Sequence, residues 1–303
     1  MPVQSRDVFC VSADGLTLHA RETLPERTPP GAETLPVLCL PGLTRTTADF
    51  DALAQALASD AQAPRRVIAV DYRGRGLSAY DPSPTNYAIP IEMGDVLAIA
   101  QHLGLARAIV VGTSRGGLIA MTMAAMGSPL LAGVVLNDIG PVLEMAGLLR
   151  IKGYVGERPV PASWADAARG VREMFGRDFP ALGDADWLAW AQRAWRERDG
   201  HLAQTYDPAL AQTLTALTPE TPLPPLWEAF DALQPHPLML VHGGLSDLLS
   251  RDTVRAMTAR RPDLDLVTVA DQGHAPLLAD LSSVSRIAAF CARCDRTAAG
   301  ATA

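Results

Sequence analysis

Short runs of apolar residues without polar alternation recur along the chain, at residues 37–40, 67–70, 108–111, 134–136, 238–241 and 266–269. Continuous runs of this kind are typical of parallel strands, because helices cover both faces of a parallel sheet. Two earlier segments, residues 8–12 and 16–21, flank an Asp-Gly pair and alternate apolar with polar positions, as an antiparallel edge hairpin does. The pattern therefore predicts eight strands.

Between these runs, apolar residues at three- and four-residue spacing predict helices. Their expected ranges are about 48–59, 90–104, 115–127, 252–261 and 279–293. Strands that alternate with helices predict an α/β fold with an eight-stranded, mostly parallel sheet flanked by helices. We expect residues 297–303 to be a frayed tail.

The alternation is interrupted once, between residues 136 and 238, and prolines mark both ends of the gap. We expect residues 143–235 to form a helical cap inserted after the sixth strand, and residues 1–142 and 236–303 to form the core. The insertion contains all five tryptophans, which are Trp164, Trp187, Trp190, Trp195 and Trp227. Large side chains are needed to build a core in a small subdomain, and they also line apolar pockets. We expect the tryptophans to serve both purposes, and Gly42 to line the same pocket, where it lets the substrate approach the backbone closely.

The composition narrows the class of protein. The 303 residues carry 33 acidic and 26 basic side chains, a net charge of −7, which disfavours a nucleic-acid partner. The sequence shows neither a secretory signal nor an apolar run of the roughly 20 residues that span a membrane, so it predicts a cytoplasmic protein without a membrane partner. Cys291 and Cys294 form a CxxC pair, which we interpret as two thiols on one helix face rather than a metal or redox site.

The motif Gly-Thr-Ser-Arg-Gly at residues 112–116 lies between an apolar run and a helical pattern. A serine on such a sharp strand-to-helix turn has an exposed hydroxyl, because the small residues two positions away on either side let the backbone bend. A phosphate-binding loop is the alternative, but the Lys-Ser/Thr ending that it requires is absent. The motif predicts that Ser114 is a nucleophile.

A serine nucleophile needs a general base, usually a histidine oriented by a carboxylate. His274 lies just beyond the last predicted strand, in a loop that reaches the edge of the sheet where the strands end. His242, at the end of the preceding strand, is the competitor. His201 falls in the insertion and His236 lies between prolines, so we expect both to be solvated. We therefore expect His274 to be the base.

Two aspartates compete for the role of the orienting acid. Asp247 follows the apolar run 238–241 and gives the chain order Ser, Asp, His. Asp138 follows the run 134–136, where hydrogen bonds that anchor a loop would also explain an aspartate. We expect Asp247 to be the catalytic acid and keep Asp138 as the alternative, in its place or in its support.

An oxyanion hole requires two main-chain N–H groups that point to the developing negative charge. Arg115, the residue after the nucleophile, supplies one of them, and we expect Leu43 to supply the other, beside Gly42. A cation in the first turn of a helix opposes the helix dipole. We therefore expect the Arg115 side chain to pair with a buried carboxylate such as Asp138, the alternative being an acidic group of the substrate.

The strand pattern, the serine motif, the order of the three side chains and the insertion together resemble the α/β-hydrolase fold superfamily over nearly the whole chain. Residues 71–78, Asp-Tyr-Arg-Gly-Arg-Gly-Leu-Ser, resemble the loop after the fourth strand in capped members. Residues 137–141, Asn-Asp-Ile-Gly-Pro, resemble the entry into the cap. The roles that the resemblance implies are nucleophile for Ser114, base for His274, acid for Asp247 and oxyanion donors for Leu43 and Arg115.

Differences from particular members of the superfamily narrow the range of activities that we expect. Many members carry histidine where this chain has Pro41, although the register of the following two residues is kept. Haloalkane dehalogenases and epoxide hydrolases of this superfamily use an aspartate nucleophile, so Ser114 argues against both. Members that cleave carbon–carbon bonds of ring-fission products usually have a glycine-rich oxyanion loop, whereas residues 44–47 here read Thr-Arg-Thr-Thr.

The sequence therefore favours a serine hydrolase that cleaves a carboxylic ester of a small to medium, largely apolar small-molecule substrate. The reaction proceeds through an acyl-enzyme and needs no metal or cofactor. Hydrolysis of a carbon–carbon bond, a lactone or a thioester by the same triad is one alternative. A ligand-binding protein that keeps the fold without catalysis is another, because a fold does not fix a function.

Overall fold

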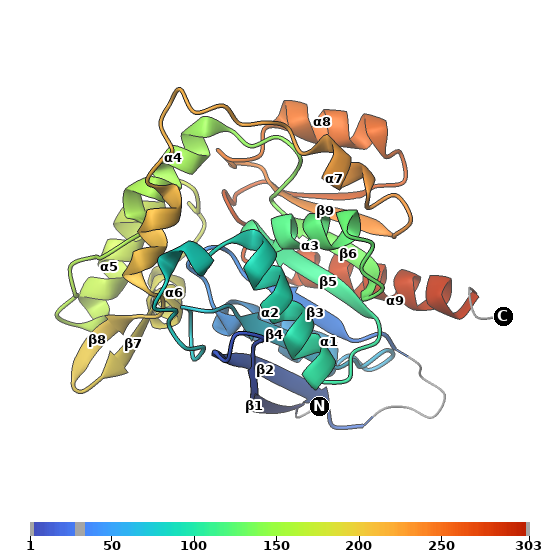
Figure 1. Ribbon diagram of the computed structural model, residues 1–303, viewed down its shortest axis with the longest axis horizontal. Coiled ribbons are helices and arrows are strands. Elements are labelled where there is room, and N and C mark those ends of the chain that lie inside the picture. Colours follow the sequence, from blue (N-terminus) through green and yellow to red (C-terminus); the bar gives the residue numbers. More distant parts are fainter. Residues whose placement is uncertain (1–2, 28–33, 301–303) are drawn as a thin grey trace.

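The computed structural model describes residues 3–27 and 34–300. An eight-stranded sheet with the order β1-β2-β4-β3-β5-β6-β9-β10 forms its centre (Figure 1). Its strands are β1 (Val3–Val11), β2 (Thr17–Pro25), β3 (Val37–Leu40), β4 (Val67–Asp71), β5 (Ala108–Thr113), β6 (Leu131–Asn137), β9 (Leu238–Gly243) and β10 (Asp265–Val269). Only the pairings β1–β2 and β2–β4 are antiparallel among these. The predicted strands and the mostly parallel sheet are confirmed.

Helices cover both faces of this sheet. They are α1 (Asp51–Ala58), which follows the short 3-10 helix η1 (Thr47–Phe50), and α2 (Ile89–His102), α3 (Arg115–Ala125), α8 (Arg251–Arg260) and α9 (Leu281–Gly300). Alternate residues of β3 show why the strand is apolar throughout, because Leu38 packs in the core with α2 and α3 and Cys39 packs in the core with α1 and α9. Every side chain of such a strand is buried, as a parallel sheet requires.

Helix α9 extends further than the sequence predicted. It continues to Gly300, so residues 297–300 are helical rather than frayed, and residues 301–303 lie outside the described part of the chain. Ala298 and Ala299 favour this extension, since alanine has the highest helix propensity. Cys291 and Cys294 are both buried on the sheet side of α9, and burial raises the pKa of each thiol to about 12.

Most of the chain between β6 and β9 forms a group of elements beside the sheet, from α4 to β8, whereas α7 lies next to α8 (Figure 1). The elements of this segment are α4 (Met145–Tyr154), α5 (Trp164–Phe175), α6 (Asp184–Ala194), β7 (Trp195–Arg198), β8 (His201–Gln204), the 3-10 helix η3 (Pro208–Leu214) and α7 (Trp227–Asp231). Helices α5 and α6 build their own core around Phe175, Phe179 and Trp190. Helix α7 packs against α3 instead, with Phe230 in the main core.

The hairpin of β7 and β8 was not expected in a helical insertion. Its turn is formed by Asp199 and Gly200, with φ of 52° and 78°. An Asp-Gly pair between two short strands is a recognised hairpin signal, because both positions of this turn need positive φ. The sequence therefore contained the information for this element.

Across residues 3–27 and 34–300, every helix is too short or too polar to cross a membrane.

Candidate active site

Ser114 occupies the sharp turn between β5 and α3, as the sequence predicted, with a φ of 50°. The flanking glycines make this turn possible. A Cβ added to Gly112 would lie 2.6 Å from the backbone of Gly116, and a Cβ added to Gly116 would lie 2.1 Å from the carbonyl oxygen of Leu40. Helix α3 therefore approaches β5 and β3 at a distance that only glycine allows, and this approach fixes the serine at the end of the strand.

The Ser114 hydroxyl is one end of a continuous chain of hydrogen bonds. Its Oγ lies 2.9 Å from Nε2 of His274, and Nδ1 of His274 lies 2.8 Å from Oδ2 of Asp138. A carboxylate can only accept, so Nδ1 donates to Asp138 and Nε2 accepts from the serine. Asp138 is fully buried and the His274 side chain is 6% exposed. This arrangement can remove the hydroxyl proton as Ser114 attacks a carbonyl.

The expected pairing of His274 with Asp247 is wrong. Asp247 accepts two hydrogen bonds from Arg150 of α4, at 2.5 Å from Nε and 2.7 Å from Nη2. Burial disfavours the charged form of Asp247, but the hydrogen bonds and charge of Arg150 outweigh it and hold the pKa of Asp247 below its ordinary value. The sequence pattern could not show that the insertion supplies an arginine to this loop.

Asp138 is held in place from three sides. Its backbone has a φ of 55° at the end of β6, and its N–H donates to Val241 of the neighbouring β9. The Gly243 N–H donates to Oδ1 at 2.8 Å, and the Ser246 hydroxyl donates to Oδ2 at 2.6 Å. The end of β9 and the loop after it therefore contribute hydrogen-bond donors to the Asp138 carboxylate, rather than a carboxylate of their own.

Ser246 is a positioning residue that the sequence reasoning missed. Its Oγ also accepts the N–H groups of Leu248 and Leu249, at 3.2 and 3.1 Å. We expect Ser246→Ala to lower kcat for the expected ester hydrolysis by about 10-fold, with little change in KM, because the hydrogen bond from Ser246 to the Asp138 carboxylate is lost. Ser246→Thr keeps the hydroxyl and serves as the control. Steady-state kinetics that show equal rates for Ser246→Ala and wild type would refute this role.

A buried ionic network connects the two segments proposed to carry the oxyanion donors. Arg75 donates from Nε to the Leu43 carbonyl at 2.8 Å and from Nη1 to Glu92 at 2.7 Å. The other Glu92 oxygen accepts from Nε of Arg115 at 2.5 Å. The expectation that Arg115 pairs with Asp138 is therefore wrong, because α2 places the fully buried Glu92 between the two arginines. The network fixes both segments relative to Ser114.

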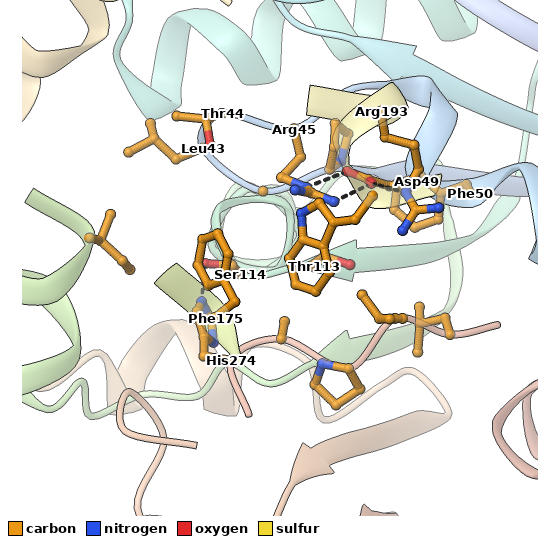
Figure 2. A pocket seen from close by; sticks show the side chains of 18 of the residues that line it. Leu43, Thr44, Arg45, Asp49, Phe50, Thr113, Ser114, Phe175, Arg193 and His274 are labelled. Carbon is orange, nitrogen blue, oxygen red and sulfur yellow. Dashed lines mark hydrogen bonds and ion pairs between the residues drawn. The ribbon is translucent and has the colours of Figure 1, made fainter. Parts of the chain in front are cut away.

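A cavity opens beside Ser114 and His274 (Figure 2). Its apolar wall includes Phe50, Ile151, Tyr154, Phe175, Trp190, Leu277 and Leu278. Gly42 lines another part of the wall, as expected, and Leu43 lies beside it. The open space is about 100 Å³, smaller than the roughly 150 Å³ of a cavity that admits benzene. The apolar part of the cavity thus suits a short apolar chain, and Arg45, Asp49 and Arg193 form its charged part.

Most of the tryptophans lie away from this cavity. Trp190 lines it, and Trp195 lines an adjoining recess that shares Trp190 as a wall. Trp164 and Trp187 border a groove on the outer side of α5 and α6, and Trp227 packs against Phe230. The prediction of pocket residues is wrong for Trp164, Trp187 and Trp227. Their place depends on how the helices of the insertion dock, which helical spacing alone does not determine.

The sheet with helices on both faces, and the hydrogen-bonded serine, histidine and aspartate at the ends of its strands, define the α/β-hydrolase class of protein. A model of the alpha/beta hydrolase family matches residues 37–286. The chain belongs to this family.

Several known proteins are similar to this chain over most of its length. A 3-hydroxybutyrate-oligomer hydrolase from Cupriavidus necator is 31% identical, over 92% of this chain and 94% of its own. The crystal structure of an alpha/beta hydrolase from Novosphingobium aromaticivorans has a TM-score of 0.86 and 37% identity, with coverage of 97% and 100%. A 2-(acetamidomethylene)succinate hydrolase from Mesorhizobium japonicum is 28% identical, over 68% and 71% of the two chains.

Proposed function

We propose that this protein is a serine hydrolase that cleaves carboxylic esters through an acyl-enzyme. The observation that carries the proposal is the continuous hydrogen-bond chain from Asp138 through His274 to Ser114, at 2.8 and 2.9 Å, on the wall of a cavity. A free serine hydroxyl is too weak an acid to attack an ester, and this arrangement removes its proton at the moment of attack.

The reaction follows from the positions of these groups. Ser114 Oγ attacks the ester carbonyl as Nε2 of His274 takes its proton, and the N–H groups of Leu43 and Arg115 stabilise the resulting oxyanion. His274 then returns the proton to the leaving alcohol, and the acyl group stays on Ser114. Water repeats the sequence, with His274 as its base, and releases the acid. Asp138 stabilises the imidazolium in both steps.

Helices α4, α5 and α6, within residues 143–235, act as the cap over this site. Ile151 and Tyr154 of α4, Phe175 of α5 and Trp190 of α6 all contribute to the apolar wall of the cavity. The cap therefore selects small to medium, largely apolar groups on the substrate, because it excludes water from a narrow space.

An ester is favoured over other acyl bonds by a relative with near full-length similarity. The Cupriavidus necator protein is named for hydrolysis of 3-hydroxybutyrate oligomers, and the units of such oligomers are joined by ester bonds. Hydrolysis of a carbon–carbon, lactone or thioester bond would use the same triad. A non-catalytic binding protein would not need the serine, histidine and aspartate to be aligned.

Initial rates on p-nitrophenyl esters from acetate to decanoate test this function. We expect turnover of the short esters, and a decline of about 10-fold or more towards decanoate, because about 100 Å³ of open space cannot enclose a ten-carbon acyl chain. The linear 3-hydroxybutyrate dimer, a thioester and a ring-fission diketone complete the panel. Turnover of the diketone or the thioester far above any ester would replace the proposal with that activity. Binding without turnover of any of them would replace it with the non-catalytic alternative.

A further inference from the structure

The cavity beside Ser114 contains two guanidinium groups and one carboxylate (Figure 2). Arg45 follows β3, Asp49 lies in η1 and Arg193 lies near the end of α6. Arg45 donates from Nε and Nη2 to the two oxygens of Asp49, at 2.6 and 2.5 Å, and its guanidinium lies 5.1 Å from the ring centre of Trp190. Asp49 is therefore already paired with Arg45 through both of its oxygens.

Arg193 shares the Asp49 carboxylate with Arg45, so this ion pair engages only one of its nitrogens. Its Nε is 3.3 Å from Asp49 Oδ1, while its Nη1 and Nη2 make no hydrogen bond to any residue in the described part of the chain. Burial, together with the nearby charge of Arg45, lowers the pKa of Arg193. Its side chain remains 26% exposed, and the residue lines the cavity.

The charged side chains that line the cavity with Arg193 leave a net positive charge there. The negative charge of Asp51 acts to raise the pKa of Arg193, against the effect of burial. Asp51 is itself paired with Arg21, at 3.5 Å, and neither Asp51 nor Arg21 lines the cavity. Apart from His274, the lining carries two positive charges and one negative charge. By comparison, Arg150 donates two hydrogen bonds to the two carboxylate oxygens of Asp247, as Arg45 does to Asp49. Among the described residues that line this cavity, Arg193 is the arginine with two donor nitrogens that make no hydrogen bond.

We propose that Arg193, with Arg45 beside it, binds a carboxylate carried by the substrate, so that the preferred esters are those that bear a free acid group. The planar fork of a guanidinium matches a carboxylate through two parallel hydrogen bonds. The apolar wall between this cation and Ser114 would hold the short chain that joins the acid group to the ester. The inference rests on the proposed ester hydrolysis and adds the substrate class.

Matched substrate pairs that differ only in charge test the inference. One pair places the group on the alcohol side, as 3-(butanoyloxy)butanoate and its carboxamide. The other places it on the acyl side, as the p-nitrophenyl ester of adipic acid and its carboxamide. We expect wild type to prefer the acid over the amide by about 10- to 100-fold in kcat/KM for at least one pair, since a charge-assisted hydrogen bond is gained. Equal rates on acid and amide in both pairs would overturn the inference.

Variants then assign the preference to Arg193. Arg193→Gln should lower the acid-to-amide ratio at least about 10-fold, and Arg193→Lys should keep part of it, because the charge stays while the fork is lost. Arg172→Gln, on the exposed side of α5, is the matched arginine control and should leave the ratio unchanged. An unchanged ratio in Arg193→Gln would assign the preference elsewhere and overturn this role.

A binding measurement separates this inference from the proposed function. Calorimetry on wild type compares glutarate with glutaramide, and it needs neither turnover nor a folded variant. Binding of glutarate alone, if no ester is hydrolysed, would support the anion subsite and refute ester hydrolysis. Turnover of neutral esters, with no difference between glutarate and glutaramide, would keep the proposed function and refute the subsite.

Discussion

Replacement of Asp138 by asparagine is expected to lower kcat for ester hydrolysis by about 10⁴-fold, because the amide no longer holds His274 in the tautomer that accepts the serine proton. Oδ2 of Asp138 is the atom in contact with Nδ1 of His274, at 2.8 Å. The measurement is kcat on the best p-nitrophenyl ester, together with thermal unfolding to show that the variant is folded.

Asp247→Asn is the matched control for this prediction. Its side chain pairs with Arg150 rather than with His274, so we expect a loss in kcat of less than about 10-fold, together with some loss of stability from the broken ion pair. A larger loss of activity in Asp247→Asn than in Asp138→Asn would show that the acid is Asp247 and that the hydrogen bond of Asp138 is structural.

Replacement of Ser114 by alanine should have the largest effect on activity. We expect kcat to fall by about 10⁴- to 10⁶-fold, because covalent attack is removed and only the oxyanion donors and substrate binding remain. The loss is measured as the rate of ester hydrolysis, after subtraction of the rate without active enzyme. A fluorophosphonate should also add one label per wild-type chain, at Ser114 by peptide mass mapping, and none to the variant. Activity above a tenth of wild type would exclude Ser114 as the nucleophile.

Local sequence determined the elements on which the proposed nucleophile, Ser114, and the proposed base, His274, lie. The apolar runs fix which segments become buried strands, and Gly112 and Gly116 fix the sharp turn at Ser114, because both effects act over a few residues. The loop that carries His274 follows the last strand and needs only the strand order to reach the serine. Within β3, the neighbouring residues Leu38 and Cys39 pack in different cores, because successive side chains of a strand point to opposite faces of the sheet.

The choice of the proposed acid depends on contacts between residues that are far apart in the sequence. Asp138 and Asp247 follow the adjacent strands β6 and β9, so both reach the same edge of the sheet. The choice between them depends on Arg150, which α4 brings to Asp247, and on the Ser246 hydroxyl, which points to Asp138. These contacts join residues about 100 positions apart, and no periodicity in the sequence encodes them.

The cavity shows the same division between sequence and tertiary structure. The sequence by itself determined the α/β architecture, the serine turn and the presence of an aromatic insertion, because hydrophobic periodicity and glycine act within single elements. Only the tertiary structure decided that Trp190 rather than Trp227 lines the cavity and that Arg193 lies with Arg45 and Asp49. The docking of one element on another places these side chains, and that docking depends on the packing of whole helices rather than on any single segment.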